Sequence, residues 1–307
     1  MTKINKNIVI AALARDCGES LHNNIILIEQ LRERFAWSQV VIVENDSKDN
    51  TKQILANWEK DKKQVKIISQ DFGTTTIPSK TEVNVSPTLS FYRIEKMSQY
   101  RNIYLDYIAG LSNQIDYVIV IDIDIKSFSV EGLVKSIINA PEDWGGIFAN
   151  GCTRRKILGF TSKMYFDMFA LYEYPLIDKF YYDQKYFDES FQRAYKNIKN
   201  NKYYNVVSAF GGIGIYKYEA IKDIRYKALK NSVNEEEGIC EHIPNNVEVI
   251  NRGYKNYIAR DFDVFYGEHL LGLMVKYYLP INLFNFLYPK FKGAVGAFNK
   301  LSYKHKD

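Results

Sequence analysis

The fold of this 307-residue chain is decided by residues 117–124, which read YVIVIDID. The first five form an apolar run of strand length, and aspartates follow at positions 122 and 124. Since residues i and i+2 of a strand point to the same face, the carboxylates of Asp122 and Asp124 should project together from the end of a buried strand. Two carboxylates that close repel each other, so the pattern predicts a site for Mn²⁺ or Mg²⁺. A pair of acids in a turn or at a helix cap is the alternative interpretation.

Two similar apolar runs, residues 8–14 and 40–43, lie upstream, and each ends in a polar loop. A third, residues 65–68, follows, and helix-forming segments separate these runs. This alternation predicts an α/β fold with a mostly parallel sheet and right-handed crossovers. Ligands of such sheets bind at the carboxyl ends of the strands. We therefore expect the loops at 15–18 and 44–47 to lie near the aspartate pair.

The remaining pattern predicts one large domain, residues 1–269, followed by a tail, residues 270–307. Residues 72–89 are rich in Thr, Ser and Pro and are expected to form a loop over the site, and residues 97–111 have helical spacing. The tail mixes apolar and aromatic residues with lysines. That mixture suits either a helical segment at a membrane surface or a helix packed on the domain.

Composition excludes several classes of protein. The formal net charge is only +5, and its 41 Lys and Arg are spread out rather than gathered in a strip, so we expect no nucleic-acid partner. No run of 18 apolar residues is present, and the first residues lack a signal-peptide pattern. The three cysteines, Cys17, Cys152 and Cys240, have neither disulfide nor metal-site spacing. We expect a cytoplasmic protein, and the membrane-surface interpretation of the tail would add a peripheral contact to the inner face of the cell membrane.

The order of the motifs resembles the GT-A fold of sugar-nucleotide glycosyltransferases. Along the chain, a strand is followed by residues 44–51 (ENDSKDNT), then by Arg101-Asn102, and then by the aspartate pair. More narrowly, this order looks like that of the fungal capsule-associated α-1,3-mannosyltransferase family and its bacterial relatives, and the resemblance covers residues 7–265. The resemblance implies metal-dependent transfer of a hexose from a UDP- or GDP-sugar to an acceptor hydroxyl. A surface polysaccharide or lipid-linked glycan is the acceptor that it suggests.

The resemblance also implies which residues contact the donor. It places Glu44 and Asp46 at the nucleoside, Arg15 beside the base or ribose, and Arg101 at the diphosphate, where a guanidinium can hold phosphate oxygens. The alternatives are a turn acid for Glu44 and a surface arginine for Arg101. A tight turn is the alternative for the glycine pair at 211–212, which the resemblance places beside both sugars. The donor-binding residues implied in this way are Arg15, Glu44, Asp46, Arg101, Asp122, Ile123, Gly211 and Gly212.

A second cluster, Cys240-Glu241-His242, resembles the late Cys-Glu-His segment of the family. Related enzymes often add a late histidine to the metal of the aspartate pair, which makes His242 and His269 candidate ligands. A histidine bonded to a backbone carbonyl is the alternative for each. Glu241 and Asp124 are the candidate catalytic residues. Glu241 would act as the general base for the acceptor hydroxyl or, in a retaining transfer, would position the sugar.

Two other functions fit parts of the pattern. A sugar-phosphate nucleotidyltransferase shares the α/β plan, but it should have a Gly-rich loop followed by Arg and Lys, which residues 11–15 (AALAR) do not provide. A non-catalytic nucleotide-sugar-binding scaffold should lose a metal carboxylate or the basic diphosphate contact, and both are present here. Catalysis is therefore favoured. Asp167 is a further candidate near the site, and Asp261 and Asp263 are alternatives for metal or sugar contact.

Overall fold

The computed structural model describes residues 3–157, 160–174 and 184–268. His269 and the expected tail, residues 270–307, lie outside the described residues, so the division into a domain and a tail stays a prediction. None of the helices within the described part is long and apolar enough to cross a lipid bilayer.

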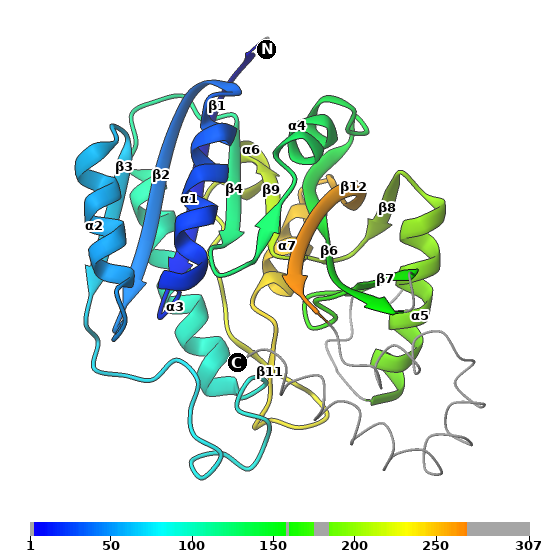
Figure 1. Cartoon of the computed structure of the whole chain (residues 1–307). Coiled ribbons are helices and arrows are strands. Elements are labelled where there is room, and N and C mark those ends of the chain that lie inside the picture. Colours follow the sequence, from blue (N-terminus) through cyan, green and yellow to red (C-terminus); the bar gives the residue numbers. More distant parts are fainter. Residues whose placement is uncertain (1–2, 158–159, 175–183, 269–307) are drawn as a thin grey trace.

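The centre of the molecule is a ten-stranded sheet, and its first four strands along one side are parallel, as predicted (Figure 1). These are, in spatial order, β3 (Val65–Gln70), β2 (Phe35–Asn45), β1 (Ile4–Ala14) and β4 (Tyr117–Asp122). The sheet continues from β4 through antiparallel β9 (Ile213–Lys217), then β6 (Trp144–Ile157), β12 (Lys255–Gly267) and β5 (Ser127–Phe128). Strands β7 (Phe160–Tyr165) and β8 (Tyr203–Val206) pair with β6 and β12, and β10 (Leu229–Lys230) pairs with β11 (Gly238–Ile239). The α/β class is confirmed.

Helices cover both faces of the sheet, because each central strand is apolar on both sides. In β1, Ile8 and Ile10 face one core while Val9 and Ala11 face the other, and none of them is exposed. One face is covered by α1 (Gly18–Arg32), α2 (Thr51–Asp61) and α4 (Val130–Ile138). The other carries α3 (Phe91–Ala109), α5 (Gln184–Asn200), α6 (Tyr218–Ile221) and α7 (His242–Asn251).

Two expected boundaries differ from the structure in ways that affect the site. The helix expected at 97–111 begins earlier, because Ser90 caps it by accepting a hydrogen bond from the backbone N of Arg93 (3.3 Å). The strand that carries the aspartates ends at Asp122, and residues 123–124 form a turn.

Candidate functional site

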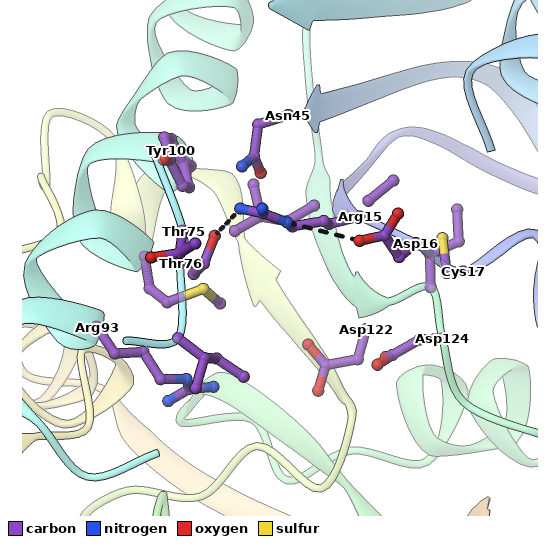
Figure 2. Close-up of a pocket in the computed structure, with 15 residues that line it drawn as sticks. Arg15, Asp16, Cys17, Asn45, Thr75, Thr76, Arg93, Tyr100, Asp122 and Asp124 are labelled. Atoms are coloured by element: carbon purple, nitrogen blue, oxygen red, sulfur yellow. Dashed lines mark hydrogen bonds and ion pairs between the residues drawn. The ribbon is translucent and has the colours of Figure 1, made fainter. Parts of the chain in front are cut away.

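A pocket of about 440 Å³ opens at the carboxyl ends of β1, β2 and β4, where ligands of parallel sheets bind (Figure 2). The opposite wall is formed by the first turns of α3 and by part of the loop that follows β3. The lining residues are Leu13, Ala14, Arg15, Asp16, Cys17, Asn45, Thr75, Thr76, Ile77, Arg93, Met97, Tyr100, Asp122, Ile123 and Asp124.

Asp122 and Asp124 both line this pocket, but they do not reach it as neighbours on one face of a strand, which was the expectation. The backbone N of Asp122 still donates to Gly212 O (2.8 Å), and the turn that follows brings the exposed Asp124 back to the same side. Ile123 between them is buried in the core against α1, α2 and α4, which anchors the turn. Burial and the charge of Asp124 raise the pKa of Asp122 to about 7, although Arg101 acts in the opposite direction.

The aspartate pair fits a hard divalent cation. Two carboxylates face an open pocket and raise each other's energy when both are ionised, which a cation between them would relieve. Within the described residues, no group of three or more His, Cys, Asp or Glu side chains is arranged to hold a metal ion. The described residues therefore offer two carboxylates at this pocket, and water or phosphate oxygens of a substrate could supply further ligands.

Arg101 lies beside the pocket rather than in its lining, as part of a buried cluster. Its side chain is 3% exposed, and its Nε donates to Glu241 Oε1 (2.9 Å) while Nη2 lies 3.7 Å from Asp122 Oδ1. The rings of Phe210 and Tyr226 each lie 5.6 Å from its guanidinium carbon. Arg101 is therefore neither a surface arginine nor a pocket wall, and its position suits holding Asp122 in place.

Glu241 is the residue before α7 and is almost fully buried beside Arg101. Burial alone would raise the pKa of Glu241, but the charge of the Arg101 guanidinium paired with it outweighs this effect and lowers the pKa to about 2. A carboxylate with so low a pKa is a weak proton acceptor. The geometry therefore favours a positioning role for Glu241 over the role of general base.

His242 also belongs to the buried cluster. Its ring stacks on Phe210 at 3.9 Å between centroids, its Nδ1 lies 3.5 Å from the hydroxyl of Tyr226, and its Nε2 lies 4.0 Å from Glu241 Oε1. Burial and the charge of Arg101 lower its pKa well below the usual range, so the ring is neutral. His242 is not grouped with the aspartate pair in a metal-binding arrangement. Its assignment as a metal ligand, like that of His269, stays a prediction.

The Gly211-Gly212 turn is hydrogen-bonded to the backbone of Asp122. Both glycines have positive φ, and a Cβ on Gly211 would lie 2.2 Å from the carbonyl oxygen of Ala149, so only glycine fits. The backbone N of Gly211 donates to Asp167 Oδ2 (2.8 Å), which brings Asp167 to the same region. Burial and the charge of Asp122 raise the pKa of Asp167 to about 8. The glycine pair therefore has the turn role that was the alternative, and its contact with the sugars stays a prediction.

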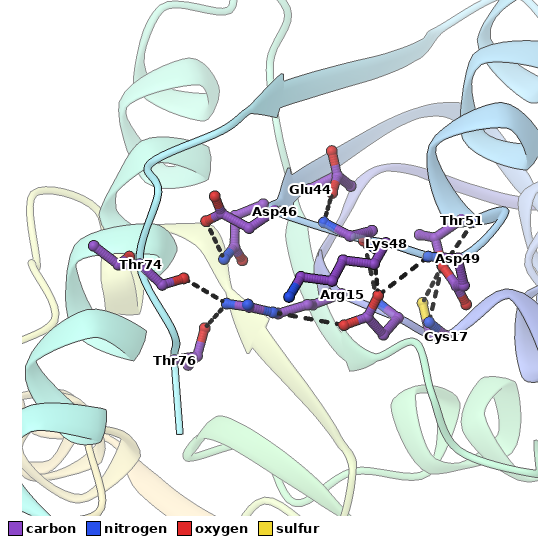
Figure 3. Close-up of polar contacts among 12 residues, drawn as sticks. Arg15, Cys17, Glu44, Asp46, Lys48, Asp49, Thr51, Thr74 and Thr76 are labelled. Carbon is purple, nitrogen blue, oxygen red and sulfur yellow. Dashed lines mark hydrogen bonds and ion pairs between the residues drawn. The ribbon is translucent and has the colours of Figure 1, made fainter. Parts of the chain in front are cut away.

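Arg15 lines the pocket and is hydrogen-bonded to the loop that follows β3 (Figure 3). Its Nη1 donates to Thr74 O (3.0 Å) and to Thr76 Oγ1 (3.0 Å), and its Nε lies 3.8 Å from Asp16 Oδ2. The loop expected over the site is therefore held at the pocket wall by a side chain from the end of β1.

Glu44 and Asp46 follow β2 but have different surroundings. Glu44 is fully buried and accepts hydrogen bonds from the backbone N of Ser47 (2.9 Å) and the hydroxyl of Ser69, so it fills the turn role that was the alternative. Asp46 has a positive φ, and its Oδ1 accepts from the backbone N of Gly73 (2.8 Å). Neither residue lines the pocket; their neighbour Asn45 does.

The remaining acidic candidates lie in ion pairs outside the pocket lining. Asp263 pairs with Arg154 (3.0 Å) and Lys163 (2.5 Å), and Asp261 pairs with Arg260 (3.0 Å). The pocket wall formed by α3 was not expected from the sequence. The spacing of Arg93, Met97 and Tyr100 places them on one helix face, and this spacing could have indicated the wall.

A family model described as cryptococcal mannosyltransferase 1 matches residues 7–244. No curated protein sequence matches the chain. Among solved structures, the mannosyltransferase PcManGT from Pyrobaculum calidifontis, in complex with GDP-Man and Mn²⁺, shares 10% identity and a TM-score of 0.49 over 85% of this chain and 57% of that one. TarS residues 1–349 from S. aureus shares 13% identity, with a TM-score of 0.43 over 87% of this chain and 61% of that one. The chain spans about three fifths of each of these structures.

Proposed function

The chain belongs to the cryptococcal mannosyltransferase 1 family, and we propose that it is a glycosyltransferase that moves a hexose from a UDP- or GDP-sugar to an acceptor hydroxyl in a metal-dependent reaction. The observation that carries the proposal is the aspartate pair of residues 122 and 124, which faces a pocket at the carboxyl ends of three strands within the matched residues. A glycan or lipid-linked acceptor and a contact with the membrane stay predictions.

Different parts of the pocket would bind different parts of a nucleotide sugar. The part between the ends of β1 and β2 and residues 75–77 offers polar and apolar atoms for a nucleoside. Asp122 and Asp124 would hold a divalent cation, which, when bound, supplies positive charge to the diphosphate as it leaves. Arg101 and the Gly211-Gly212 turn keep Asp122 in one orientation before substrate binds.

The acceptor hydroxyl must lose a proton during transfer, and Glu241 is poorly suited to take it. Its carboxylate is buried and paired with Arg101, and its pKa is about 2. Glu241 also lies outside the pocket lining, so its contacts support the positioning of neighbouring protein groups, and the expected positioning of the sugar stays a prediction. Through Arg101 it would fix Asp122, which is a positioning rather than a catalytic role.

The test is calorimetric titration of the protein with GDP and with UDP, with Mn²⁺ and with a chelator, for the wild type and an Asp124→Asn variant. Asp261→Asn is the matched control, because it makes the same chemical change at an exposed residue paired with Arg260. We expect one nucleotide to bind in a Mn²⁺-dependent manner, with that dependence lost only in Asp124→Asn. Absence of binding of either nucleotide by the wild type would overturn the proposal.

Binding alone does not separate an enzyme from a binding scaffold. Incubation with GDP-mannose or UDP-glucose and Mn²⁺ should release the nucleoside diphosphate, slowly by hydrolysis and faster with a suitable acceptor. Tight binding of the intact donor without any release would favour the non-catalytic scaffold.

A further inference from the structure

The first turns of α3 bring a charged side chain to the pocket that the sequence did not single out. Arg93, Met97 and Tyr100 are spaced four and three residues apart, so they share one face of the helix, and all three line the pocket. Figure 2 shows Arg93 across the pocket from Asp122, with its guanidinium pointing into the space between them.

Arg93 and Arg15 are the two basic residues of the pocket lining, and they are engaged differently. Arg15 donates to Thr74 and Thr76 and lies near the carboxylate of Asp16. Arg93 donates to one carbonyl oxygen, that of Thr88 (3.1 Å), and no carboxylate of the described residues forms an ion pair with it. Arg93 therefore keeps donor N–H groups available for an anion in the pocket.

The residue expected to contact the diphosphate, Arg101, lies two turns further along α3 and is occupied. Its guanidinium is shared between Glu241 and Asp122, and it is almost fully buried outside the pocket lining. An incoming anion would have to compete with the buried carboxylate of Glu241 for this guanidinium. Displacing Glu241 would leave a buried charge unpaired, which is strongly unfavourable.

We propose that Arg93 binds the diphosphate of a nucleoside diphosphate or nucleotide sugar, on the side of the pocket opposite the aspartate pair. The inference rests on the proposed function and assigns its anion contact to this residue. A guanidinium offers a planar fork of N–H donors that matches two phosphate oxygens. The diphosphate would then lie between a cation held by the aspartates and the guanidinium of Arg93.

The experiment compares Arg93→Ala and Arg93→Lys with the wild type, using GDP and UDP as probes of the diphosphate and guanosine and uridine as probes of the nucleoside. Lys96→Ala is the matched control, since it removes one positive charge from the same helix outside the pocket lining. Affinities for the diphosphates come from calorimetry with Mn²⁺, and those for the nucleosides from ligand-observed NMR.

We expect Arg93→Ala to weaken binding of the preferred nucleoside diphosphate about 10- to 100-fold, the range for a hydrogen bond to a charged group, while nucleoside binding stays unchanged. Arg93→Lys should recover part of the loss, and Lys96→Ala should bind like the wild type. An unchanged diphosphate affinity in Arg93→Ala, or an equal loss for diphosphate and nucleoside, would overturn the assignment of Arg93 alone. A wild type that binds no nucleotide would overturn the proposed function as well.

Discussion

Two clusters of charged side chains meet at Asp122, and they differ in how completely their charges are paired. The pocket cluster, open to solvent, consists of Arg15, Asp16, Arg93 and Asp124. The buried cluster, on the other side of Asp122, consists of Arg101, Tyr104, Phe210, Tyr226, Glu241 and His242. In the buried cluster the guanidinium contacts two carboxylates and two rings, whereas in the pocket cluster Arg93 has one carbonyl partner.

This difference follows from the cost of removing charge from water. A charge in the protein interior must be paired and hydrogen-bonded, so the buried cluster has little freedom to bind anything else. A charge at a pocket wall stays hydrated until a ligand arrives, so leaving it partly unpaired costs little. The buried cluster therefore fits a fixed support, and the pocket cluster fits a surface that is completed by substrate.

Breaking the buried cluster should have the largest effect. Arg101→Met keeps most of the side-chain volume but leaves Glu241, 3% exposed, without its guanidinium. We expect the free energy of unfolding to fall by about 3–5 kcal/mol, measured by chemical denaturation. Arg93→Met makes the same change on the same helix and should cost less than about 1 kcal/mol. Equal losses in the two variants would show that the clusters do not differ in pairing.

The pH dependence of stability should distinguish the two carboxylates beside Arg101. The pKa of Glu241 is lowered from 4.5 to about 2, so its contribution to stability is present above pH 4.5 and is lost as the pH falls toward 2. The pKa of Asp122 is raised from 3.8 to about 7, so its contribution is present below pH 3.8 and is lost as the pH rises through about 7.

The measurement for this prediction is denaturation of the wild type and Asp122→Asn between pH 4 and pH 8, in chelator so that no metal shifts the titration. The wild type should lose stability relative to Asp122→Asn as the pH rises, by at most about 1.4 kcal/mol per pH unit for one proton. A constant difference between the two proteins over this range would contradict the raised pKa of Asp122.

The sequence alone predicted the features that depend on residues close together in the chain. Apolar runs of strand length predicted the parallel half of the sheet, and the aspartate pair was found because its two members are two residues apart. The pairing of Arg101 with Glu241 joins residues 140 positions apart, which no spacing rule in one sequence can show. Arg93 was missed because the cap at Ser90 extends the helix six residues upstream of the expected start at residue 97. For Glu44 the sequence left the nucleoside role and the turn role open; the bond from Ser47, three residues away, is local, whereas the contact with Ser69 is made only when β3 pairs with β2.

The smallest effect on stability should come from the residue on which the proposed function depends most. Asp124 is exposed, and within the described residues no hydrogen bond or ion pair to its side chain is found. Its charge instead raises the pKa of Asp122, so neutralising it removes a repulsion. Asp124→Asn should therefore change the free energy of unfolding by no more than about 0.5 kcal/mol, with any change toward higher stability at pH 8. The same variant should lose Mn²⁺-dependent nucleotide binding. A destabilisation above about 2 kcal/mol would mean that Asp124 supports the turn after β4, and that a loss of nucleotide binding in this variant reflects a damaged fold instead of a missing metal ligand.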